Sequence, residues 1–184
     1  KAHDAVRAVM RGRVGAAITM AFTPRAGIAQ VVLGHHIAVV VVPASRPLRN
    51  LNAARLEHAL GRPSATWAGV DGGSGTIRLW AGPKNAAREL LVTMLRTGPG
   101  SAAKPDIVFR LPSSARGQDR DAIALHRVTE NELSMAIVSL ASLSYDRRLR
   151  VVPIDNVTPS RRAHLNERYP YGQALVLIHR KGKP

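Results

Sequence analysis

Few residues in this sequence have the types and spacing that catalysis or metal binding needs. His35 and His36 are adjacent, and neighbouring residues on a strand point to opposite faces, so we expect a structural role and no shared metal ion. Asp155 lies in a turn without a partner carboxylate. There is no Cys, and no zinc-protease, nucleophile-elbow or P-loop motif is present. The sequence therefore predicts a protein that is not an enzyme and that has no cofactor and no metal.

The charge of the chain indicates what it attracts. Lys and Arg number 27 against 12 Asp and Glu, which gives a formal net charge of +15. Arg binds phosphate and carboxylate through a two-pronged guanidinium, so such a chain favours anions. The alternative is a coding bias toward Arg and Ala. No block of five or six like charges occurs, which disfavours nucleic acid as a partner. A nucleic-acid binder that uses the basic surface is the weaker alternative.

The apolar pattern alternates between strands and helices, which predicts an α/β fold with mainly parallel sheets. No apolar run approaches the roughly 20 residues of a membrane helix. We predict a capping box between Thr129 and Glu132 at the start of one helix, and flexible loops at 101–105 and 113–121. The predicted strands are 14–22, which is expected to be buried, 37–42, 76–80, 106–111, 151–154 and 174–179. The predicted helices are 2–10, one capped by Asn50 or Asn52 and ending at Leu60, 85–96, and one starting at the capping box and continuing through Met135.

Several segments follow one another in an order that resembles a known family. The strand from Gly34 to Pro43 leads to a helix with Leu51, Leu56, Leu60 and Gly61, and Trp67 follows. Downstream come the segments Ala136 to Leu140, Val151 to Ser160, and Tyr169-Pro170. This order is similar to that of the phosphate-binding periplasmic proteins, which have a type II periplasmic-binding-protein-like domain, and the match extends over most of the chain.

The resemblance implies a two-lobed periplasmic-binding-protein-like fold. The first lobe would comprise 1–42 and 144–184, and the second 43–143. Nothing in the sequence matches the strand and Gly-Ser turn that open the family, so we expect the first lobe to be incomplete. A preceding segment or another chain would complete it.

The resemblance also implies where a ligand would bind. The family's Arg-x-x-x-Ser-Gly-Thr corresponds here to the segment Ala81 to Arg88, in which Asn85, Ala86 and Ala87 replace the tripeptide and Ala81 replaces the arginine. Lys84 and Arg88 flank a helix N-terminus whose amides can bind an anion, although a solvated basic first turn is the alternative. A second loop offers Thr23 and Arg25. Ser74-Gly-Thr76 matches the tripeptide by letter but precedes a strand, so it is interpreted as a turn.

The implied function is binding of phosphate or a similar oxyanion by a periplasmic or secreted domain that serves a membrane importer. The departures in the ligand loops leave an alternative, a degenerate binding-protein fold that acts as a protein-interaction or scaffold domain.

Overall fold

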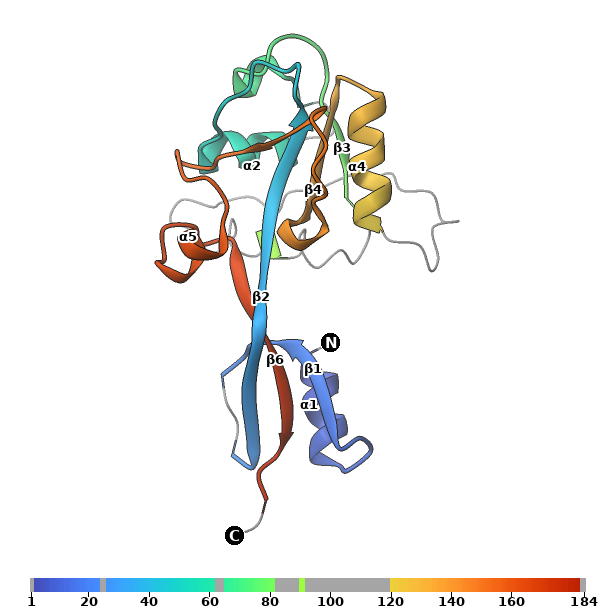
Figure 1. Ribbon diagram of the computed structural model, residues 1–184, viewed down its shortest axis with the longest axis vertical. Coiled ribbons are helices and arrows are strands. Elements are labelled where there is room, and N and C mark those ends of the chain that lie inside the picture. Colours follow the sequence, from blue (N-terminus) through green and yellow to red (C-terminus); the bar gives the residue numbers. More distant parts are fainter. Residues whose placement is uncertain (1, 24–25, 62–64, 82–89, 92–119, 183–184) are drawn as a thin grey trace. The chain divides into compact units, whose positions relative to one another are not determined.

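The computed structural model describes residues 2–23, 26–61, 65–81, 90–91 and 120–182 (Figure 1). The chain forms two compact units, Lys1–His36 with Gly172–Pro184, and Ile37–Tyr171. We call them the small unit and the large unit. The lobe boundaries expected from the sequence differ from the boundaries of these units and remain a prediction. The predicted helix 85–96, strand 106–111 and loop 101–105 lie wholly or mostly outside the described residues, although 90–91 are helical.

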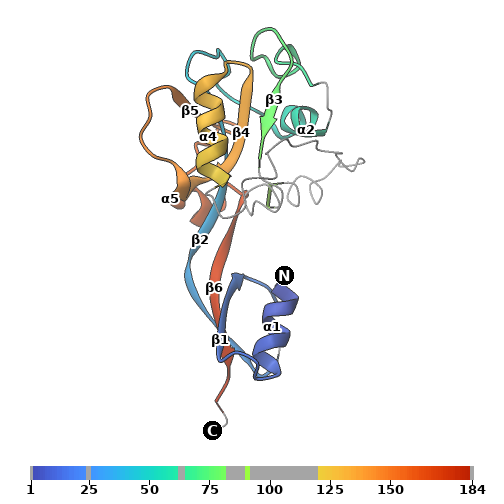
Figure 2. The same ribbon diagram turned by 90° about the vertical axis from the view of Figure 1, so that its right-hand side faces the viewer.

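The small unit is a helix on a three-stranded sheet. Helix α1 (Ala2–Met10) has the predicted bounds, and β6 (Gly172–Arg180) lies between β1 (Ala16–Met20) and the first part of β2 (Ile28–Pro43). Strand β1 is antiparallel to β6, with Ile18 opposite Leu177. The buried cluster that joins helix and sheet consists of Val6, Val9, Ile28, Val176 and Ile178. Figure 2 shows α1 against one face of these strands.

The prediction that residues 14–22 form a buried strand is wrong in part. The strand is real but shorter, and Ile18 is 61% exposed. Side chains alternate across a strand, so Ala17 faces α1 while Ile18 faces the opposite side. Only one face of β1 is therefore covered in the described structure.

The large unit contains a mixed sheet. Its strands are the second part of β2, β3 (Arg78–Trp80), β4 (Ser134–Ser139) and β5 (Leu149–Val152). Strand β2 pairs antiparallel with both β4 and β5, and β3 pairs parallel with β4. The α/β class is confirmed, but most strand pairs whose register the structure defines are antiparallel, so the expectation of mainly parallel sheets is wrong for these strands.

One helix of the large unit begins at a side-chain cap. Helix α2 (Ala53–Gly61) is capped by Asn52, whose Oδ1 accepts the Arg55 N–H at 2.8 Å. The other helices whose bounds the structure describes are α4 (Arg120–Glu130), α5 (Arg161–Leu165) and the short 3-10 helices η1 (Ala68–Val70) and η2 (Leu140–Ser142). No helix in the described part of the chain is long and apolar enough to span a membrane.

The predicted capping box is wrong. Thr129 lies in the last turn of α4 rather than before a helix, and its hydroxyl donates to the His126 carbonyl at 2.7 Å. All six residues of β4 are buried, and a short apolar run of this kind suits a strand that is covered on both faces. Residues 120–121, expected in a loop, instead start α4.

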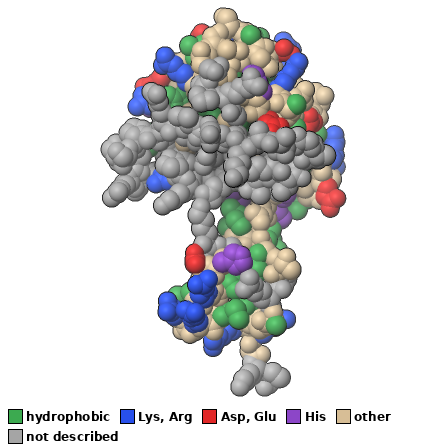
Figure 3. All heavy atoms as spheres, turned by 180° about the vertical axis from the view of Figure 1, so that it is seen from behind, with side chains coloured by type: hydrophobic (Ala, Val, Ile, Leu, Met, Phe, Trp, Pro, Cys, Tyr) green, Lys and Arg blue, Asp and Glu red, His purple; other side chains and the backbone are tan. Residues whose placement is uncertain are grey.

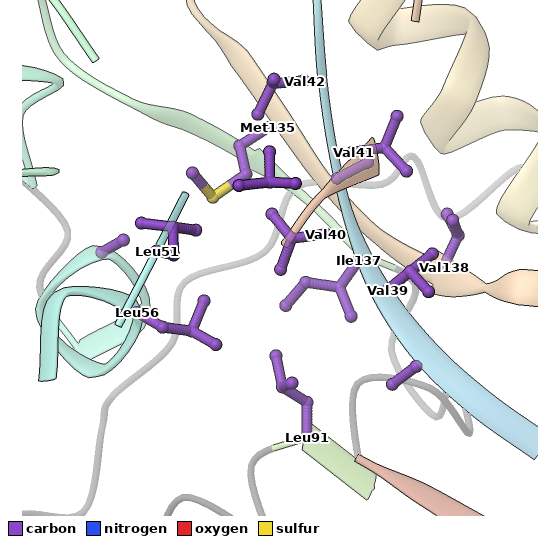
Figure 4. Packing of buried hydrophobic residues seen from close by; sticks show 14 of the residues in the cluster. Val39, Val40, Val41, Val42, Leu51, Leu56, Leu91, Met135, Ile137 and Val138 are labelled. Carbon is purple, nitrogen blue, oxygen red and sulfur yellow. The ribbon is translucent and has the colours of Figure 1, made fainter. Parts of the chain in front are cut away.

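The core of the large unit surrounds the interior strand β2, as predicted for 37–42. Residues 38–42 have no exposed surface, and Ile37 is 3% exposed. Val40 pairs with Ile137 and Val39 with Val138. Figure 4 shows Val40 and Ile137 pointing with Leu56 and Leu91 to one side of the strand, and Val39 and Val138 to the other. Burial on both faces explains the β-branched run.

Candidate ligand-binding site

The carboxyl ends of β3 and β4 meet at one edge of the large unit's sheet. The two strands are parallel, with Trp80 opposite Ala136, and their chains leave the sheet at Ala81 and Ser139. In α/β sheets, ligands bind outside the carboxyl ends of parallel strands, where loops and helix N-termini come together. This edge is the place in the described structure where the predicted ligand segment begins.

A carboxylate organises the end of β4 at this edge. The Oδ2 atom of Asp121 accepts the backbone N–H of Ser139 at 2.7 Å and the hydroxyl of Ser142 at 2.9 Å. Asp121 lies in the first turn of α4, where a negative charge is favoured by the helix dipole. The Ser139 hydroxyl in turn accepts the Ala141 N–H at 3.3 Å. The edge therefore has a fixed backbone with hydroxyl and carboxylate groups built into it.

These residues were missed from the sequence. Asp121 falls in the loop expected at 113–121, and Ser139 is predicted only as part of the segment Ala136 to Leu140. A usable signal was present, because Ala124, Leu125 and Val128 form a helical apolar stripe, all three buried. Asp121 stands three residues before this stripe, where a helix start favours an acidic residue.

The side chains that hold β3 and β4 are satisfied within the protein. The Trp80 indole N–H donates to the buried Ser134 hydroxyl at 2.9 Å, and the Arg127 guanidinium lies 5.7 Å from the centre of the Trp80 ring. These contacts position β3 against β4 and α4.

The predicted ligand residues are placed only in part. Thr23 is exposed in the small unit, after β1. Arg25, Lys84, Asn85, Ala86, Ala87 and Arg88 lie outside the described residues. Ala81 has no exposed surface and belongs to the core of the large unit, so the guanidinium that the family would place here has no room. Ser74 and Gly75 form a bend, in which Gly75 has φ +99°, and Thr76 makes an isolated bridge to Thr66 before β3.

The remaining polar candidates have structural partners. The Asp155 Oδ1 accepts the Ala53 N–H at the start of α2 at 3.3 Å, and Asp155 has φ +51° in its turn. His35 and His36 are half-buried in β2. Among the described residues, no three His, Asp or Glu side chains come together as a metal site would require.

Comparison with known proteins assigns the fold. No protein-family description matches the sequence, and no curated protein does either. Solved structures do match: the chain has the fold of periplasmic binding proteins, in particular that of phosphate receptors. The ABC-type phosphate transport receptor of Vibrio cholerae is 13% identical, with a TM-score of 0.78 over 99% of this chain and 74% of that one.

Two further structures define the range of this likeness. A putative phosphate ABC transporter substrate-binding protein with bound phosphate, from Clostridium perfringens, is 12% identical, with a TM-score of 0.72 over 97% of this chain and 71% of that one. The OxyR regulatory domain of Pseudomonas aeruginosa is 15% identical, with a TM-score of 0.53 over 99% and 71%. Both transport proteins and a regulatory domain share the fold, so identities this low define the architecture alone.

Proposed function

We propose that this chain is a non-catalytic binding domain that takes up phosphate or a similar tetrahedral oxyanion at the carboxyl edge of β3 and β4. The observation that carries the proposal is the likeness to phosphate receptors over 99% and 97% of this chain. The net charge of +15 supports an anionic ligand. We expect the chain to act outside the cytoplasm, in the periplasm or secreted, and to deliver its ligand to a membrane importer.

Within the site, the amides of Asn85, Ala86 and Ala87 would donate to the anion, and Lys84 and Arg88 would supply charge. Thr23 and Arg25 belong to the small unit and remain separate predicted ligand residues. Because the family's hydroxyls and arginine are absent here, several charge-assisted hydrogen bonds of about 1.5–3 kcal/mol each are lost. Affinity for phosphate is therefore expected to be weak, with a dissociation constant well above the micromolar range.

Calorimetry at low salt with inorganic phosphate tests the proposal. The double variant Lys84→Ala/Arg88→Ala should weaken binding by at least about tenfold, as loss of charged donors implies. Asp121→Asn should strengthen binding severalfold, because it removes a like charge from the edge. The control is Arg161→Ala/Arg162→Ala, which removes two exposed arginines from α5 and should leave affinity unchanged.

A second candidate is an interaction or scaffold domain that keeps the fold without a ligand. It is favoured by the small unit, which holds six of the eight large hydrophobic side chains exposed in the described structure. The same titration separates the two candidates. No heat with phosphate at millimolar concentration, or equal losses in the Lys84/Arg88 variant and its control, would contradict the binding site and favour the scaffold.

A further inference from the structure

The positive charge of the chain is concentrated in the small unit. Its sequence has eight Lys and Arg against a single acid, Asp4, and thus contributes 8 − 1 = +7 of the +15. Asp4 lies in the first turn of α1, whereas Arg11 and Arg13 follow the other end of that helix. A field of one sign is therefore presented at the end of α1, where no acidic side chain adjoins it in the sequence.

The turn after α1 is fixed by backbone bonds and by β6. The N–H groups of Arg11 and Arg13 donate to Arg7 and Ala8 at 3.0 and 2.9 Å, and Gly12 adopts φ +69°. The Arg180 guanidinium donates to the Met10 carbonyl. The chain beyond β6 is held beside β2, since the Lys181 N–H donates to the Gly27 carbonyl at 3.0 Å. We call residues 10–14 with Arg180 and Lys181 the tip.

Aliphatic side chains lie between the cations of the tip. Met10 is 46% exposed and Val14 is 42% exposed, and Arg11 and Arg13 between them in sequence are exposed as well. Figure 3 shows hydrophobic and basic side chains next to one another on the small unit. Ile18 on β1 is a further apolar side chain of the small unit, and it is 61% exposed.

We propose that the tip binds the surface of an anionic lipid bilayer. Guanidinium and ammonium groups would lie at the level of the headgroup phosphates, and Met10 and Val14 would enter the boundary between headgroups and acyl chains. Charge complementarity selects this partner over a second copy of the chain, because two copies at +15 each repel one another.

Nucleic acid matches the charge but not the apolar part of the tip. Strand-binding proteins stack bases on aromatic side chains, and the small unit contains a single aromatic residue of that kind, the half-buried Phe22. Exposed Met and Val gain nothing from a sugar-phosphate backbone, whereas a bilayer interface removes them from water.

Co-sedimentation with vesicles tests the proposal. The whole chain should bind phosphatidylcholine vesicles that contain phosphatidylglycerol, should not bind pure phosphatidylcholine, and should dissociate as salt is raised. The charge variant Arg11→Glu/Arg13→Glu should lose at least about thirtyfold in partitioning, since each cation near an anionic surface contributes about fivefold. The apolar variant Met10→Gln/Val14→Ser should lose several-fold while leaving any binding to a DNA duplex unchanged.

The matched control is Arg161→Glu/Arg162→Glu, which makes the same change in net charge on the large unit and should retain binding within about twofold. All substituted side chains are exposed, and circular dichroism confirms folding of each variant. Equal losses in the tip variant and the control would overturn the proposal, because attraction would then follow net charge alone. Absence of binding to anionic vesicles would also overturn it. So would a result in which a DNA duplex displaces the vesicles and the Met10→Gln/Val14→Ser variant loses its binding to that duplex.

Discussion

Arg46 should be a major source of stability in the large unit. Its Nε atom donates to the Glu132 carbonyl at 2.5 Å, and Nη1 donates to the carbonyls of Gly72 and Ser74 at 3.3 and 3.1 Å. The guanidinium also lies 4.9 Å from the centre of the Trp67 ring. One side chain thus joins three segments that are distant in sequence, namely the chain after β2, the segment 72–74 and the loop before β4.

The expected cost of Arg46→Ala follows from these contacts. Because Arg46 is only half-buried, each hydrogen bond contributes about 0.5–1.5 kcal/mol and the cation–π contact about 0.5–1 kcal/mol. Shared partners make the losses less than additive, so we expect a decrease of about 2–4 kcal/mol in the free energy of unfolding. Arg46→Lys keeps the charge but not the planar fork, and should recover less than half of this.

Urea unfolding followed by tryptophan fluorescence measures this effect in the right unit, since both tryptophans, Trp67 and Trp80, lie in the large unit. Arg49→Ala is the control, because Arg49 is an exposed arginine three residues away and its loss should stay within about 0.5 kcal/mol. If Arg46→Ala destabilised the unit no more than Arg49→Ala does, the carbonyl contacts of Arg46 would have no energetic weight and the reasoning would be refuted.

Two further predictions concern buried aromatic rings. Burial and the neighbouring Tyr171 raise the pKa of Tyr169 above its ordinary value of 10.0, so the folded state favours the neutral phenol; stability should be complete below pH 10.0 and fall as pH rises further. Tyr169→Phe should flatten that decline with pH. It also leaves the Ala38 carbonyl without its donor at 2.9 Å, which should lower the free energy of unfolding by about 1–3 kcal/mol at neutral pH. Urea melts at several pH values check both effects, and the control Tyr145→Phe, at a side chain that is 88% exposed, should change neither. Gly72→Ala would place a Cβ 2.3 Å from Cε3 of the buried Trp67 ring and should destabilise the large unit by about 1–3 kcal/mol in the same melts. The control Gly34→Ala, whose Cβ would have nothing within 4 Å, should have little effect. If both variants lost the same stability, the Trp67 ring would be free to move aside.

The sequence predicted elements best where one pattern dominates. Helix 2–10 and the interior strand at 37–42 were predicted correctly because an amphipathic stripe and a β-branched run have few alternatives. The prediction of a helix through Met135 was wrong because Thr129 and Glu132 match the capping-box pattern by their spacing alone. Tertiary burial of the 134–139 run on both faces overrides that local preference.

The candidate site was less predictable than the fold. Asp121 and Ser139 are 18 positions apart in sequence, and only the packing of α4 beside β4 brings them to 2.7 Å. The sequence shows that position 81 is not an arginine, but it does not show why. The structure supplies that reason, since Ala81 is enclosed by the core.

The pairing of β1 with β6 has a consequence for the order in which the protein is made. Ala16 pairs with His179, so the small unit closes only after β6 has been synthesised, whereas Ile37–Tyr171 is one continuous stretch. During synthesis the large unit can fold first, and the apolar faces of α1 and β1 stay exposed to water in the meantime. Closing so long a loop is slow. Until β6 has been made, α1 and β1 therefore expose apolar surface that a chaperone would be expected to cover.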